Sequence, residues 1–137
     1  MHECIFCKII NRELPASIIY EDHHVIAFLD IAQTSPGHTL VVPKEHHDTF
    51  LGTPKKIMHY VMDVAQRIGQ AQIKKLNARG VNVLINSYPE AGQTVAHYHV
   101  HVIPRYGKKD GLKIEMVEQL DNAKNLPILV SKIKSGL

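Results

Sequence analysis

The segment that most constrains how this chain can fold runs from His97 to Ile103 and reads His-Tyr-His-Val-His-Val-Ile. Strict alternation of this kind predicts a β-strand, in which successive side chains point to opposite faces of a sheet. The imidazoles of His97, His99 and His101 are therefore expected on one face, about 6.6 Å apart along the strand. The apolar side chains between them are expected on the other face.

Three interpretations of this strand are open. It can be a structural strand that exposes three polar rings by chance. It can hold a metal ion, because imidazole is a common metal ligand. It can also handle phosphate, because histidine forms covalent intermediates. A hydrophobic core has no use for three stacked polar rings, so the chemical interpretations are favoured, and the phosphate-handling one most of all.

The rest of the pattern predicts an α+β fold. A helix-like segment covers residues 4–12, and Thr53 and Pro54 begin a long amphipathic helix that continues to about Asn77. Strands are expected at residues 17–20, 25–29, 38–42, 81–85 and 96–103. Because the first three follow one another through short connections, we expect a five-stranded antiparallel sheet with one long and one short helix packed on it.

Composition places limits on function. The 137 residues are enough for a single domain, with 45% hydrophobic and 21% charged residues, as in ordinary globular proteins. No apolar run approaches the roughly 20 residues that span a membrane, and the N-terminus lacks a signal peptide, so we expect a cytoplasmic protein without a membrane partner. The net charge of +3 is too small to indicate nucleic-acid binding, and it does not oppose an anionic small substrate.

The two cysteines, Cys4 and Cys7, form a Cys-x-x-Cys motif. A stable disulfide is not expected in a cytosolic chain. A redox pair usually lies near a βαβ pattern, which this sequence does not offer. Two interpretations remain: the cysteines pack in the core, or they form half of a zinc site, provided that two further ligands exist.

Four segments, in the right order, resemble those of the histidine triad nucleotide hydrolases and transferases, in particular the prokaryotic Hint-like branch. They are Cys4–Ile10, Phe28–Ile31, Gly37–Lys44 and Gly92–Arg105. The resemblance covers a core from Cys4 to about Gly111 and leaves residues 112–137 as a C-terminal extension without a signature. It implies the α+β fold described above and a homodimer whose two sheets join into one.

The resemblance also implies roles for the triad. The middle histidine, His99, is the expected nucleophile, which attacks the α-phosphorus of a purine nucleotide and forms a nucleotidyl-histidine. His101 is expected to donate a hydrogen bond to a phosphate oxygen or to the leaving group, unless its role is only to hold the strand. His38 matches a histidine that lies behind the nucleophile.

Further residues are candidates for substrate binding. Asp30 can accept hydrogen bonds from both ribose hydroxyls, although an aspartate that caps a turn would look the same. Gly92 allows close approach of the backbone to a ligand. By resemblance, Asn86 and Thr94 contact the phosphates and Gln93 covers them. An apolar slot for the base is expected from four residues: Ile5, Phe6, Phe28 and Ile31.

In several prokaryotic members of the family, positions matching Cys4, Cys7, His46 and His97 hold zinc. His47 is a competing ligand next to His46. Four protein ligands close the coordination tetrahedron, so such a zinc ion would be structural.

The leading prediction is a nucleotide hydrolase or nucleotidyl transferase that acts on adenosine 5′-phosphoramidates or related substrates. Residues 90–95 resemble instead the branch that hydrolyses dinucleoside polyphosphates. Arg105, Lys108 and Lys109 could meet a polyphosphate tail, unless they form a solvated basic turn. Two other classes are open: a zinc-stabilised nucleotide-binding module with weak activity, and a metalloenzyme built on the three histidines.

Overall fold

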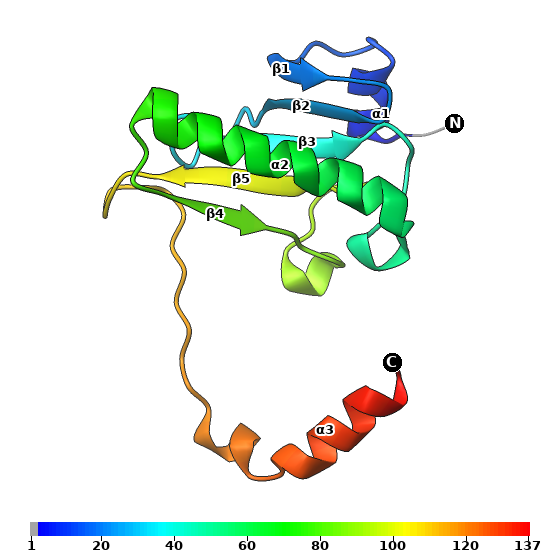
Figure 1. Ribbon diagram of the computed structural model, residues 1–137, viewed down its shortest axis with the longest axis vertical. Helices are drawn as coiled ribbons and strands as arrows, with labels where there is room; N and C mark the ends of the chain where they lie inside the picture. The colour runs from blue at the N-terminus through cyan, green and yellow to red at the C-terminus, as the bar shows by residue number, and fades with distance from the viewer. Residues whose placement is uncertain (1–2) are drawn as a thin grey trace.

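The computed structural model describes residues 3–137 and contains a five-stranded antiparallel sheet (Figure 1). Its strands are β1 (Ile18–Glu21), β2 (Val25–Leu29), β3 (Thr39–Pro43), β4 (Gly80–Leu84) and β5 (Val100–Arg105). They lie in the order β1-β2-β3-β5-β4, and every neighbouring pair is antiparallel. The predicted α+β class is confirmed. Met1 and His2, where the predicted domain begins, lie outside the described residues.

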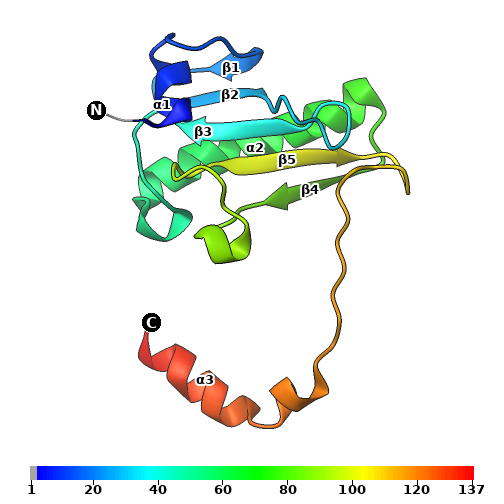
Figure 2. The ribbon, with the colours of Figure 1, turned by 180° about the vertical axis from the view of Figure 1, so that it is seen from behind.

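Two helices cover opposite faces of this sheet. The long helix α2 (Lys55–Leu76) crosses one face in Figure 1, and the short helix α1 (Ile5–Ile10) lies on the other face, seen from behind in Figure 2. Strand alternation divides the core between them. The cluster on the α2 side contains Val25, Ala27, Val41, Val61, Val64, Ala65, Ile68, Tyr98, Val100 and Val102. The cluster on the α1 side contains Phe6, Ile9, Ile26, Phe28, Leu40 and Val42.

The start of α2 differs from the prediction by one residue. The Thr53 hydroxyl does not cap the helix but donates to the Thr49 carbonyl, at 2.8 Å. Pro54 is the N-cap instead, and its carbonyl accepts the first helical hydrogen bond, from the Met58 amide. At the other end Asn77 adopts a left-handed conformation (φ 59°), which asparagine tolerates and which ends the helix as predicted.

β5 begins at Val100, four residues later than predicted, and continues to Arg105. The backbone before it bonds outside the sheet, because the Tyr98 amide donates to the His47 carbonyl at 2.7 Å. The alternation of side chains nevertheless extends through this segment. Tyr98 packs in the cluster on the α2 side, whereas the Phe6 ring contacts the imidazoles on the α1 side.

Residues 112–137 leave the sheet as a C-terminal arm, and both views show its helix apart from the sheet on the side of β4 (Figures 1 and 2). The arm contains a 3₁₀ turn, η3 (Leu120–Ala123), and a helix, α3 (Leu126–Ser135), neither of which was predicted. Two shorter 3₁₀ turns lie in the part of the chain before the arm: η1 (Phe50–Gly52) and η2 (Pro89–Ala91). Across residues 3–137, no helix has the length and apolar character needed to cross a membrane.

The base of the arm is fixed by Arg105. Its guanidinium donates to the Asp110 carboxylate at 3.0 Å, to Asn82 Oδ1 at 2.6 Å and to the Leu112 carbonyl at 3.0 Å. The Gly111 amide donates to the Thr34 carbonyl at 2.6 Å. The Arg105 guanidinium is therefore engaged within the fold and not part of a solvated basic turn.

Candidate active site and metal centre

The protonation pattern of His99 follows from its hydrogen bond to the backbone. Its Nδ1 lies 2.7 Å from the His97 carbonyl oxygen. A carbonyl can only accept, so Nδ1 carries the proton and Nε2 keeps a free lone pair. Burial lowers the pKa of His99, which keeps the ring neutral at pH 7. The ring of Phe6 packs edge-on against it, with centroids 5.0 Å apart.

His101 has the opposite pattern. The Thr34 amide points at Nδ1 of His38, at 3.4 Å, so that nitrogen is an acceptor and the His38 proton lies on Nε2. His38 Nε2 lies 2.9 Å from Nδ1 of His101 and donates to it. The proton of His101 is therefore on Nε2, where it can serve as a donor. Burial lowers the pKa of His101 to about 4, so this ring is also neutral at pH 7.

Both rings line a cavity of about 370 Å³ between α1, β2 and the approach to β5. Seven predicted site residues besides Thr94 line it: Ile5, Phe6, Phe28, Asp30, Ile31, His99 and His101. Phe6 and Phe28 are buried and pack edge-to-face, with centroids 5.6 Å apart, whereas Ile5 and Ile31 are exposed. The expected apolar slot therefore has buried aromatic rings at its base and exposed aliphatic side chains at its edge.

Asp30 lies at the end of this slot. One carboxylate oxygen accepts from the Ala32 amide at 2.8 Å, as a turn-capping aspartate does. The other lies 3.6 Å from His38 Nε2. Asp30 therefore caps the turn after β2 and also lines the cavity, so the two interpretations of this residue are compatible.

The loop before the triad is placed differently from expectation. Thr94 lines the cavity, but Gln93 is turned inward and buried. The Gln93 amide nitrogen donates to the Asp48 and Val95 carbonyls, at 2.7 and 3.0 Å, and its oxygen accepts from the Tyr88 amide at 2.7 Å. The polar groups of Gln93 hold the loop in this structure, so these hydrogen bonds would have to break before the side chain could cover the phosphates.

Asn86 and Gly92 also lie in this loop but do not line the cavity. Asn86 Nδ2 lies 3.5 Å from the Gly92 carbonyl. Gly92 has φ +100°, a conformation that L side chains rarely adopt, and it ends η2. In this structure both residues shape the turn that leads to Thr94.

The second candidate site is a cluster of four predicted zinc ligands. One atom from each of Cys4, Cys7, His46 and His97 lies within 4.8 Å of the others. The first turn of α1 brings the cysteines together: Cys4 is its N-cap, and its Sγ accepts from the Cys7 amide at 3.3 Å. His47 is not in the cluster, and its Nε2 lies 2.9 Å from a Glu45 carboxylate oxygen.

The distances fit a tetrahedral zinc ion. Bonds of about 2.3 Å to sulfur and 2.0–2.1 Å to nitrogen place S and N about 3.5 Å apart at a tetrahedral angle. Here His97 Nδ1 lies 3.4 Å from the Cys4 sulfur and 3.6 Å from the Cys7 sulfur, and His46 Nδ1 lies 3.2 Å from Cys7. Burial raises the pKa of the Cys7 thiol to about 11, a shift that a bound dication would oppose.

Groups outside the cluster orient both histidines for a metal. His97 Nε2 donates to the Pro43 carbonyl at 2.8 Å, and His46 Nε2 lies 2.9 Å from an Asp48 carboxylate oxygen. Each ring therefore turns a lone pair on Nδ1 toward the cysteines, as metal-ligating histidines commonly do. Asp48 was not predicted; its position two residues after His46 was the available signal.

Comparisons with known proteins agree with this architecture. Residues 11–108 match the model of the HIT domain family. The chain is 45% identical over 108 residues to Protein hit of Bacillus subtilis, covering 79% of this chain and 74% of that protein. It is 36% identical over 104 residues to Adenylylsulfatase HINT3 of Arabidopsis thaliana, covering 76% of this chain and 53% of that protein.

Solved structures show the same fold. A member of the HIT family from Bacillus subtilis superposes with a TM-score of 0.93 at 39% identity, over 99% of this chain and 98% of that one. A histidine triad nucleotide-binding protein from Candida albicans gives 0.86 at 30% identity, over 98% and 96%. A Zn-bound histidine triad family protein from Mycobacterium smegmatis gives 0.77 at 34% identity, over 98% of both chains. The sequence match, the shared fold and the identities together establish that this chain belongs to the HIT domain family.

Proposed function

We propose that this chain is a nucleotide hydrolase or nucleotidyl transferase that attacks the α-phosphorus of a purine nucleotide through Nε2 of His99. Family membership supports a nucleotide-binding hydrolase or transferase in general. The observation that carries the finer proposal is the opposite protonation of two neighbouring rings. His99 presents a lone pair to the cavity, and His101 carries its proton on Nε2. One ring is thus prepared as a nucleophile and the other as a hydrogen-bond donor.

The proposed reaction has two displacements. In the first, the lone pair of His99 Nε2 forms a bond to phosphorus, and the bond from phosphorus to the leaving group breaks. His101 donates a hydrogen bond from Nε2 to the leaving group, which departs with a proton taken from solvent water, and the His97 carbonyl stabilises the positive charge on the substituted ring. In the second, a water oxygen bonds to phosphorus, the bond to His99 breaks, and the proton of the attacking water passes to solvent while His101 keeps its hydrogen bond to the phosphate. Both rings return to their starting states.

The cavity supports recognition of a purine ribonucleotide. The aromatic pair Phe6 and Phe28, with Ile5 and Ile31, would hold the base, and Asp30 would accept hydrogen bonds from the ribose hydroxyls. Thr94 would contact the phosphates. An adenosine 5′-phosphoramidate or another adenylyl compound is the proposed substrate class. The name of the Arabidopsis thaliana relative, an adenylylsulfatase, fits an adenylyl substrate.

Zinc is the proposed cofactor, held by Cys4, Cys7, His46 and His97. When bound, it supplies a cross-link and no reactive water, because four protein ligands leave no open position. The Zn-bound relative from Mycobacterium smegmatis supports this proposal. His97 connects this centre to the reaction, because its ring belongs to the cluster and its carbonyl accepts a hydrogen bond from His99 Nδ1.

A substrate panel tests the proposal. Purified protein is incubated with adenosine and guanosine 5′-phosphoramidates and with dinucleoside polyphosphates, and kcat/KM is compared. We expect the highest values for phosphoramidates and no turnover by His99→Ala. Higher values for dinucleoside polyphosphates would favour that alternative branch. Tight binding of AMP with no turnover of any substrate would favour an interaction module.

A further inference from the structure

The apolar face of α3 is not covered by any of residues 3–137. Leu126, Leu129, Val130 and Ile133 lie at i, i+3, i+4 and i+7, which places them on one stripe of the helix. They are 44–66% exposed. Ser131 and Ser135 lie on the opposite side. An isolated helix of ten residues is marginal in water, so α3 needs a surface that covers this stripe.

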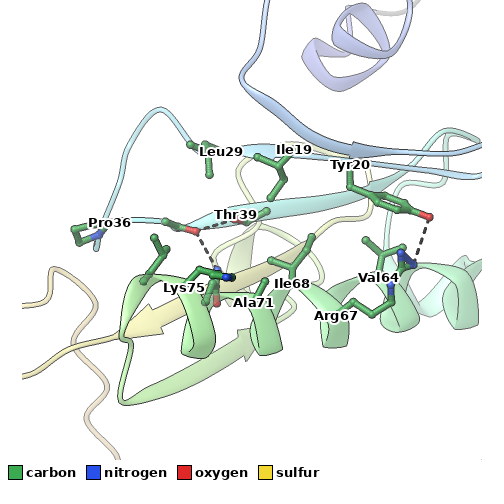
Figure 3. Close-up of a pocket in the computed structure, with 13 residues that line it drawn as sticks. Ile19, Tyr20, Leu29, Pro36, Thr39, Val64, Arg67, Ile68, Ala71 and Lys75 are labelled. Carbon is green, nitrogen blue, oxygen red and sulfur yellow. Dashed lines mark hydrogen bonds between the residues drawn. The ribbon is translucent and has the colours of Figure 1, made fainter.

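An apolar groove on the sheet is also exposed to solvent. On the α2 face, between β1 and α2, a groove of about 570 Å³ opens to solvent (Figure 3). Its apolar lining includes Ile19, Leu29, Val64, Ile68, Ala71 and Leu76. Figure 3 shows side chains of β1 and of α2 directed into the same space. Ile19, at the irregular register between β1 and β2, is 49% exposed.

The position of the arm is shared with solved relatives. A TM-score averages, over all residues, a term that cannot exceed one. Residues 1–111 are 111 of 137, or 0.81 of the chain, so a TM-score above 0.81 requires that part of the arm superposes as well. The Bacillus subtilis structure scores 0.93, and HIT family structures from Bacillus anthracis and Streptococcus mutans score 0.93 and 0.92. The arm thus points away from its own domain in these proteins too.

We infer that α3 of one copy of this chain docks in the groove between β1 and α2 of a second copy, and that the two copies exchange arms. In this arm position, α3 lies away from the groove of its own chain. The same groove on a second copy can cover the apolar stripe of α3. The eight extended residues 112–119 can span at most about 28 Å, enough to cross to a neighbouring subunit. The hydrogen bonds of Arg105 and Gly111 fix the base of the arm.

Two charge-matched double variants of the full chain test this inference. Leu129→Asp with Ile133→Asp places two carboxylates on the stripe, and Ser131→Asp with Ser135→Asp places two on the opposite side as the control. Sedimentation equilibrium measures the dimer dissociation constant of each. We expect the first to weaken the dimer at least tenfold and the control to change it less than threefold. A third variant, Ile19→Asp in the groove, is expected to weaken the dimer as the first does.

Mixing then distinguishes exchange between copies from docking within one chain. The stripe variant keeps an intact groove, and the Ile19→Asp variant keeps an intact arm, so a mixed dimer contains one complete pair. Exchange predicts that an equimolar mixture forms dimers more tightly than either variant alone. No gain on mixing, an unchanged dimer in the stripe variant, or a monomeric wild-type protein at micromolar concentration would each overturn the inference.

Discussion

At the scale of single residues, the environment of each imidazole determines which nitrogen carries its proton. His99 and His101 have the same side chain two positions apart, yet a backbone carbonyl holds one proton on Nδ1 and a neighbouring histidine directs the other to Nε2. Neither His97 nor His38 lines the cavity, so both assignments are set before a substrate arrives. Such preorganisation lowers the barrier without a rearrangement during the reaction.

Asp30 gives a prediction at this scale. Asp30→Asn removes the charge that would accept hydrogen bonds from the ribose hydroxyls, while the residue can still cap the turn after β2 through its side-chain oxygen. Loss of one charge-assisted hydrogen bond costs roughly 1.5–3 kcal/mol, or about ten- to a hundredfold in affinity. We expect AMP to bind Asp30→Asn more weakly by this factor in calorimetric titration.

The matched ligand is 2′,3′-dideoxy-AMP, which lacks both hydroxyls. It is expected to bind the wild type and Asp30→Asn with nearly equal affinity. An equal loss of affinity for AMP and the dideoxy compound would show that Asp30 acts on the fold of the cavity and not on the ribose.

At the scale of elements, the sequence predicted what local periodicity determines. The alternation from His97 to Ile103 correctly separated imidazoles from core residues, because side-chain direction depends only on extended backbone. It did not locate the start of β5, because Tyr98 bonds to the His47 carbonyl, a partner about fifty residues away. The hydrogen bonds of Gln93 could not be predicted for the same reason: its partner at Asp48 is distant in sequence.

Two other elements show the same limit. The Cys-x-x-Cys motif indicated half of a metal site. The motif alone could not identify the other two ligands, because they come close to the cysteines only when α1 packs against the loop after β3. The helix α3 was not predicted, although its apolar stripe has helical spacing, because residues 112–137 carry no family signature. The apolar residues at helical spacing over 126–133 were the available signal.

The metal centre gives a prediction for the loop after β3. His46 and His47 are adjacent, but only the first has a ring nitrogen in the cluster. We expect His46→Ala to lower the zinc content, measured by elemental analysis of protein prepared without chelators, well below one ion per chain. The melting temperature should fall with it, because a metal that binds only the folded state stabilises that state.

His47→Ala is the matched control and should retain the zinc content of the wild type. Equal zinc in both variants would move the metal away from this cluster. Zinc-free wild-type protein would instead identify the cysteines as packing residues and leave the role of His99 unchanged.

At the scale of the whole molecule, burial of neutral histidines makes stability depend on pH. Burial lowers the pKa of His101 to about 4, against about 6.5 in the unfolded chain. Between these values the unfolded state binds more protons than the folded state, so the free energy of unfolding falls as the pH falls from about 6.5 to about 4. His101 alone would contribute at most on the order of 3 kcal/mol over this window.

Urea denaturation of the wild type and of His101→Asn at several pH values between 7.5 and 4.5 measures this contribution. We expect the stability difference between the two proteins to shift in favour of His101→Asn as the pH falls. Any effect of acid on the metal ligands is common to both proteins and cancels in the difference. Parallel pH profiles would show that His101 is not protonated differently in the folded and unfolded states.

The central claim, that His99 forms a covalent bond to the α-phosphorus, is tested most directly by the stereochemical course of hydrolysis. An adenosine 5′-phosphoramidate analogue with a chiral α-phosphorothioate is hydrolysed in ¹⁸O-labelled water, and the configuration of the product is determined. Each in-line displacement inverts phosphorus, so two displacements through His99 predict overall retention. Overall inversion would mean that water attacks phosphorus directly and would contradict the proposed role of His99.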